Sequence, residues 1–184
     1  MSEPSPERVL ESRRLYEGRI VNLRIDTVEL PGGLKATREV VEHGDVVAIV
    51  PLLEGDDVLL VRQYRLPTEK VLLEVPAGGV DVGESVEAAA QRELGEECGR
   101  RAGRLERLGG FYVSPGFCNE FVHVFLATQL EPVESHPDPD EQLTVVRLPL
   151  PEALRLVSGG EIRDGKSIIG LTWAWAKVRG FTIE

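Results

Sequence analysis

The spacing of apolar residues changes along the chain, and its first half is typical of β-structure. Residues 20–42 have apolar side chains at roughly alternate positions on both sides of a Pro-Gly-Gly turn at 31–33, which predicts an antiparallel β-hairpin. Residues 46–53 form a continuous apolar run, and residues 58–64 form a second one after an acidic turn. Such runs are typical of strands that are buried on both faces. Because an isolated hairpin is marginally stable in water, the predicted hairpin must pack against another surface.

The rest of the chain contains both helices and strands. The helix that begins near Ser85 is rich in Ala, Glu and Gln, and Gly99 ends it. The further predicted elements are strands at 71–75, 105–112, 121–130 and 145–148 and helices at 152–157 and 167–178. Because strands and helices do not alternate regularly, this order predicts an α+β form of the α/β class. We expect a mixed β-sheet between helices, preceded by an N-terminal antiparallel β-hairpin.

Chain length predicts one main domain with a small addition. The chain has 184 residues, and domains are typically about 100–150 residues long. Its first residues are polar and contain prolines, so residues 1–8 are expected to form a disordered tail. We expect residues 9–44 to form the N-terminal β element and residues 45–184 to form the main domain.

Composition narrows the function classes. The chain has 31 acidic and 21 basic side chains, a formal net charge of -10, which disfavours nucleic-acid binding through a basic surface. A small anionic substrate would need divalent cations or a local group of arginines. Cys98 and Cys118 are the only cysteines and form no CxxC pair, which suits a reducing compartment. No apolar run approaches the roughly 18 residues of a membrane span, so we expect a cytoplasmic protein with no membrane or nucleic-acid partner.

Three glutamates before Gly99 are the main chemical signal. Glu93 and Glu97 are one helical turn apart, and Glu96 is three residues from Glu93, so the three carboxylates share one helix face. Like charges at this spacing weaken a helix by roughly a few tenths of a kcal/mol per pair. Divalent cations would remove that repulsion, and magnesium prefers carboxylates, water and phosphates as ligands. Taken alone, three glutamates are more often a solvated acidic face.

The residues around these glutamates resemble the Nudix box. The segment 78–100 is GGVDVGESVEAAAQRELGEECGR, and its matching positions are Gly78, Glu84, Arg92, Glu93, Leu94, Glu96, Glu97 and Gly99. They occur in the loop-then-helix context that the motif requires. Arg100 departs from the pattern, because the family usually has an aliphatic residue there. The resemblance implies a Nudix fold and hydrolysis of a nucleoside diphosphate linked to another moiety. It also implies that Arg92 holds a glutamate in place, for which Glu84 and Glu74 are both candidates.

The resemblance further implies a metal site. Glu93 and Glu97 would be the principal ligands of magnesium, with manganese as an alternative, and more than one ion per site is expected. Glu96 would be a further ligand or a base, and the carbonyl oxygen of Ala77 would be a backbone ligand.

A loop after the box narrows the substrate. Residues 114–120 are Ser-Pro-Gly-Phe-Cys-Asn-Glu, and this loop resembles that of the ADP-ribose pyrophosphatase branch of the Nudix family. By this resemblance Glu120 is the general base or the carboxylate that orients water, and Arg65 contacts phosphate. The predicted reaction is hydrolysis of ADP-ribose to AMP and ribose 5-phosphate. The alternatives are another nucleoside diphosphate sugar such as GDP-mannose, and a non-catalytic nucleotide-ligand sensor on the same fold.

The N-terminal strands have a role in the same branch. There they exchange between subunits and help to enclose the adenosine half of the substrate, which implies a homodimer. The substrate contacts that this implies are Arg38, Glu39 and Val80. No tryptophan near this hairpin is available to stack on adenine.

A second motif is excluded by its context. Residues 160–167, GEIRDGKS, fit the P-loop pattern, but a P-loop follows a buried strand. Here residues 154–158 are predicted to be helical, and only 17 residues follow Ser167. We therefore expect Asp164 or Ser167 to cap the last helix.

Overall fold

A computed structural model describes residues 5–135 and 142–181, and it divides into two compact units. The first unit comprises Met1–Asp45 and Tyr112–Phe121, and the second comprises Val46–Phe111 and Val122–Glu184. The first four residues of the predicted tail lie outside the described residues. The loop 112–121 therefore belongs to the same unit as the N-terminal strands, although it is distant from them in sequence.

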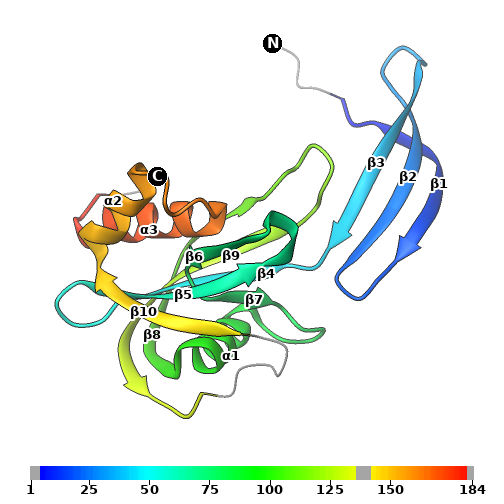
Figure 1. Cartoon of the computed structure of the whole chain (residues 1–184). Helices are drawn as coiled ribbons and strands as arrows, with labels where there is room; N and C mark the ends of the chain where they lie inside the picture. The colour runs from blue at the N-terminus through cyan, green and yellow to red at the C-terminus, as the bar shows by residue number, and fades with distance from the viewer. Residues whose placement is uncertain (1–4, 136–141, 182–184) are drawn as a thin grey trace. The chain divides into compact units, whose positions relative to one another are not determined.

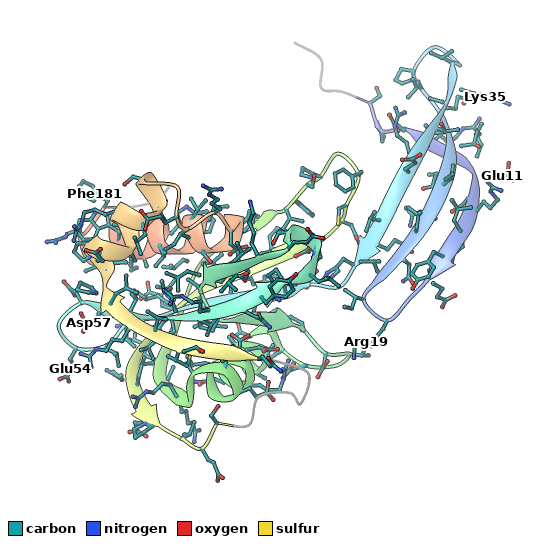
Figure 2. All side chains as sticks on the ribbon, in the orientation of Figure 1. Glu11, Arg19, Lys35, Glu54, Asp57 and Phe181 are labelled. Atoms are coloured by element: carbon teal, nitrogen blue, oxygen red, sulfur yellow. The ribbon has the colours of Figure 1, made fainter. Side chains whose placement is uncertain are left out.

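The first unit contains an antiparallel sheet with the strand order β1-β2-β3. The predicted hairpin is confirmed as β2 (Val21–Glu29) and β3 (Lys35–His43), shown in Figure 1. β1 (Arg8–Glu17) is a strand that the apolar pattern did not predict. Every residue of β1 is exposed, and side chains such as Glu11 project away from the sheet (Figure 2).

The second unit contains two sheets and three helices in its described part. The sheets have the orders β10-β5-β6 and β7-β4-β9-β8, and β4 is parallel to β9 but antiparallel to β7. The elements are β4 (Val46–Pro51), β5 (Asp57–Arg65), β6 (Lys70–Glu74), β7 (Ala77–Gly79), α1 (Val86–Cys98), β8 (Arg100–Tyr112), β9 (Phe121–Pro132), β10 (Leu143–Pro149), α2 (Leu150–Ser158) and α3 (Gly165–Val178), with the single-turn helix η1 (Leu66–Thr68) after β5. No helix among the described residues is long and apolar enough to cross a membrane.

Strand β4 explains how this unit is layered. Successive side chains of a strand point to opposite faces, and Val47 and Ile49 pack in one cluster with apolar residues of α1. Ala48 and Val50 pack in the other cluster, with residues of α2 and α3. Figure 1 shows α1 on one side of this sheet and α2 and α3 on the other. The predicted fold class, a mixed sheet between helices, is confirmed, and the continuous apolar run is explained by burial on both faces.

Candidate functional site

Helix α1 is bounded by local capping interactions. The Ser85 hydroxyl accepts a hydrogen bond from the amide of Ala88 at 3.2 Å, and Gly99 adopts a left-handed conformation with φ 58° that ends the helix. These caps set where the helix begins and ends, and packing of its apolar residues against the sheet sets which face is buried. Glu93 is 8% exposed and Glu97 is 2% exposed, so two of the predicted ligands lie on the buried face rather than in solvent.

Strand β7 contacts this buried face. The amide of Ala77 donates a hydrogen bond to Glu97 Oε2 at 3.0 Å. A Cβ atom at Gly78 would lie 2.0 Å from Glu93 Oε1 and 2.4 Å from Oε2, far closer than such atoms approach one another. The missing side chain of Gly78 therefore creates the space that the Glu93 carboxylate occupies, which is a physical reason for glycine at the first position of the box.

Arg92 connects the carboxylates of the box. Its guanidinium donates to both oxygens of Glu84 at 3.2 and 3.0 Å, to Glu93 Oε1 at 2.6 Å, to Glu96 Oε2 at 3.0 Å and to the carbonyl of Gly79 at 2.9 Å. The hydrogen bonds with Glu84 are the largest cause of the raised pKa of Arg92, and they lower the pKa of Glu84. Of the two candidate partners predicted for Arg92, the structure selects Glu84 and not Glu74.

The charge of this cluster fits divalent cations. Within the described residues, no three His, Cys, Asp or Glu side chains are arranged to hold a metal ion. Glu97 accepts from a backbone amide, and Glu93 and Glu96 accept from Arg92. The box brings three glutamates together around Arg92, and a divalent cation would offset part of their formal negative charge. Carboxylate and carbonyl oxygens are also the donor set that magnesium prefers.

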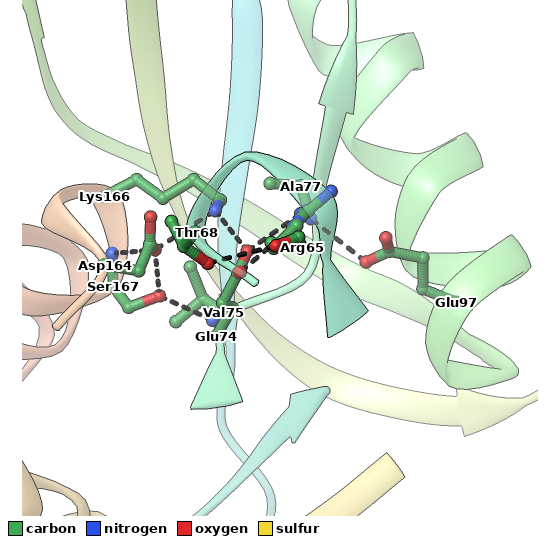
Figure 3. A network of polar contacts seen from close by, with 9 residues as sticks. All are labelled: Arg65, Thr68, Glu74, Val75, Ala77, Glu97, Asp164, Lys166 and Ser167. Atoms are coloured by element: carbon green, nitrogen blue, oxygen red, sulfur yellow. Dashed lines mark hydrogen bonds and ion pairs between the residues drawn. The ribbon is translucent and has the colours of Figure 1, made fainter. Parts of the chain in front are cut away.

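Arg65 is at the end of β5 and is bound to a buried carboxylate. Its Nε and Nη2 donate to the two oxygens of Glu74 at 3.0 and 2.8 Å, and Lys166 Nζ contacts Glu74 Oε2 at 2.6 Å (Figure 3). Burial raises the pKa of Glu74, but hydrogen bonds and charges from Arg65 and Lys166 outweigh this effect and leave the pKa below its ordinary value. Neither the contact of Arg65 with Glu74 nor that of Glu74 with Lys166 was predicted from the sequence. An acidic residue at the end of an apolar strand was the available signal for Glu74.

The first turn of α3 is joined to Val75, the residue that follows β6. Asp164 accepts a hydrogen bond from the amide of Ser167 at 3.0 Å, which confirms it as the helix cap. The Ser167 hydroxyl in turn accepts from the amide of Val75 at 2.8 Å. The segment that fits the P-loop pattern therefore serves as a helix start that is attached to the residue after β6.

The loop that contains Glu120 pairs with β3 in the first unit. The amide of Val41 donates to the carbonyl of Phe117 at 2.8 Å, and the amide of Asn119 donates to the carbonyl of Val41 at 3.3 Å. The Asn119 side chain also accepts from the amide of His43 at 2.8 Å. Glu120 itself is partly buried. No local pattern in the sequence links this loop to the hairpin, but the structure joins them.

An open cavity of about 450 Å³ lies beside this pairing in the first unit. Arg38 and Glu39 are among its lining residues and come from β3. Arg38 is held by Glu7 through contacts of 2.6 and 3.1 Å. The other lining residues are Glu7, Val40, Tyr112, Pro115, Gly116, Phe117, Cys118 and Asn119. Val80 does not line this cavity and instead packs against the cluster around α1.

Comparisons with known proteins cover almost the whole chain. A family model described as the NUDIX domain matches residues 42–168, and one described as the nucleoside diphosphate sugar hydrolase N-terminal domain matches residues 7–41. The chain is 36% identical over 173 residues to the ADP-ribose pyrophosphatase of Bacillus subtilis (strain 168), covering 93% of this chain and 94% of that protein. It is 36% identical over 153 residues to the GDP-mannose pyrophosphatase of Yersinia pestis (strain Pestoides F), covering 74% of each. A crystal structure described as an ADP compounds hydrolase matches with a TM-score of 0.87 and 26% identity, over 99% of this chain and 100% of that chain.

Proposed function

The chain belongs to the Nudix family of hydrolases, and from this membership we propose that it hydrolyses the pyrophosphate bond of ADP-ribose with magnesium, giving AMP and ribose 5-phosphate. The match over residues 42–168 confirms the resemblance found in the box. The observation that supports this function best is the pair of buried glutamates, Glu93 and Glu97, beside Ala77 and Gly78. The full-length similarity to an ADP-ribose pyrophosphatase supports the choice of substrate.

In this proposal α1 and β7 hold the magnesium ions. Glu93, Glu96 and Glu97, with the carbonyl oxygen of Ala77, would be the ligands of more than one ion. Bound magnesium neutralises the diphosphate and lowers the pKa of a coordinated water molecule. Arg92 holds Glu93 and Glu96 through hydrogen bonds, so that the ligands are oriented before substrate binds.

The remaining groups bind the substrate and move a proton. Arg65 contacts the diphosphate, and Arg38 and Glu39 contact the adenosine half. Val80, near the box loop, is a further substrate contact. Glu120 accepts a proton from the attacking water. The oxygen of that water forms a bond to one phosphorus while the bridging P–O bond breaks, so one product leaves with the bridging oxygen.

One assay tests both the reaction and its rivals. The protein is incubated with ADP-ribose or with GDP-mannose, with magnesium or with a chelator, and the products are separated by anion-exchange chromatography. We expect AMP from ADP-ribose, no product with the chelator, and slower turnover of GDP-mannose. Equal turnover of both substrates would support the second candidate, for which the similarity to a GDP-mannose pyrophosphatase is the reason. Binding without any product would support a non-catalytic sensor.

We also propose that the protein is a homodimer formed through the N-terminal sheet. β1 exposes apolar side chains, and Val9 and Tyr16 are 55% and 58% exposed, which is costly for a surface in contact with water. A monomer by light scattering at micromolar concentration would contradict this assembly. The two cysteines are free thiols, which agrees with a cytoplasmic location.

A further inference from the structure

The first turn of α3 contacts Arg65 through a carboxylate. Gly165, Lys166 and Ser167 belong to the P-loop-like motif, to which the proposed reaction gives no role. Lys166 Nζ lies 2.6 Å from Glu74 Oε2, the same oxygen that accepts from Arg65 Nη2 at 2.8 Å (Figure 3). We propose that Lys166 is a positioning residue that holds Glu74, and through it Arg65, in the geometry that binds the substrate diphosphate. This inference rests on the role proposed above for Arg65.

The geometry of Arg65 leaves part of its guanidinium available for an anion. Two parallel hydrogen bonds to Glu74 use Nε and Nη2, and such paired bonds fix the plane of a guanidinium. Among the described residues, none accepts a hydrogen bond from Nη1. The Arg65 side chain is 37% exposed, whereas that of Glu74 is 2% exposed. The exposed edge of Arg65 can therefore meet a phosphate only in the orientation that Glu74 sets.

Lys166 is placed to act through Glu74 rather than on the substrate. Its side chain is 14% exposed, and its ammonium contacts Glu74 at 2.6 Å and Asp164 at 3.1 Å. Asp164 also caps α3, so Lys166 links the start of a helix to the end of β6. A buried carboxylate held from both sides has one orientation, and removal of one cation leaves it held by Arg65 alone and less rigidly fixed.

Kinetics of three variants test this role. In Lys166→Gln we expect the KM for ADP-ribose to rise about 10-fold, the loss expected for roughly one charge-assisted hydrogen bond, with kcat changed by less than about 2-fold. Lys166→Arg should recover to within about 3-fold of the wild-type KM, because the positive charge is kept. Lys177→Gln is the matched control, since Lys177 lies on the same helix but pairs with Glu106 and is 49% exposed. It should behave as the wild type.

A double-mutant cycle distinguishes positioning from a direct or purely structural effect. In an Arg65→Met background, Lys166→Gln should raise KM by less than about 2-fold, because the group on which it acts is gone. The same 10-fold rise in both backgrounds would overturn the proposal, since Lys166 would then act independently of Arg65.

Nuclear magnetic resonance tests the inference without any turnover. The Nε–H signal of Arg65, assigned by its absence in Arg65→Met, should exchange slowly with water in the wild type and in Lys177→Gln. It should exchange at least about 5-fold faster in Lys166→Gln, because Glu74 is then held from one side only and its hydrogen bond with Nε opens more often. Fast exchange in the wild type, or unchanged exchange in Lys166→Gln, would refute positioning by Lys166. If the wild type hydrolyses no nucleoside diphosphate sugar while these exchange rates are as expected, the proposed function fails and the positioning contact stands.

Discussion

Replacing Gly78 by alanine adds one carbon atom beside the buried carboxylate of the box. The new Cβ would lie 2.0 Å from Glu93 Oε1 and 2.1 Å from Cδ, whereas an ordinary contact needs at least 3.4 Å. The carboxylate therefore has to move by roughly 1.4 Å, while the backbone at Gly78 is unstrained because its φ is not positive.

The expected loss follows from that displacement. A misplacement of about 1 Å in a catalytic arrangement can cost about 100-fold in rate, which corresponds to roughly 2.7 kcal/mol of activation free energy. Moving Glu93 also disturbs its 2.6 Å contact with Arg92, and overpacking of this kind typically lowers the free energy of unfolding by about 1–3 kcal/mol. Gly78→Ala should thus fold, with a lower melting temperature and a kcat/KM for ADP-ribose reduced at least 100-fold.

A neighbouring glycine supplies the control. A Cβ at Gly79 would meet no atom within 4 Å, so Gly79→Ala should keep wild-type kinetics. In a Glu93→Ala background Gly78→Ala should cost nothing further, because the group that it displaces is absent. Steady-state kinetics and thermal unfolding measure these effects. Gly78→Ala that stays within 3-fold of wild-type activity, or an equal loss in Gly79→Ala, would refute the reasoning.

Four further predictions concern the charged groups. Arg92→Lys should lower the melting temperature and reduce kcat/KM by about 10–100-fold, since an ammonium cannot reproduce the paired bonds of a guanidinium; a change below 3-fold by the same measurements would contradict this. Because the pKa of Glu74 is lowered in the folded protein, its ionised form stabilises the fold above the unfolded-state value near 4.5, and this contribution is lost as pH falls through the folded pKa. The melting-temperature difference between wild type and Glu74→Gln should therefore be largest near neutral pH and shrink in acid, and a difference independent of pH would count against it. Glu97→Gln should abolish turnover, and Glu120→Gln should reduce kcat by about 100-fold or more; unchanged kcat in the second variant would remove Glu120 as the base.

Local signals explain which parts of the fold were predictable. Ser85 and Gly99 bound α1 through contacts within a few residues, so the sequence alone located both ends. The continuous apolar run that begins at Val46 indicated that β4 is buried on both faces, and its residues 47–50 are fully buried. β1 was missed because all its residues are exposed and its apolar positions do not alternate, so no burial pattern was present to detect.

The site contacts that could not be predicted from the sequence join residues that are far apart along the chain. The spacing of the box placed Glu93 and Glu97 on one helix face, but their burial beside β7 depends on tertiary packing. The contact between Lys166 and Glu74 joins residues 92 positions apart, and that between His43 and Asn119 joins residues 76 positions apart. A single sequence contains no spacing rule for such pairs, so neither the contact of Lys166 with Glu74 nor that of Asn119 with His43 could be identified from it.

The pairing of β3 with the loop after β8 has a consequence for protein engineering. Val41 exchanges backbone hydrogen bonds with Phe117 and Asn119. Two segments that are distant in the sequence therefore form one structural unit and must remain compatible with each other. A chimaera that takes only residues 1–45 from a relative would pair a foreign strand with a native loop. Exchange of specificity between relatives should therefore require grafting both segments, Met1–Asp45 and Tyr112–Phe121, together.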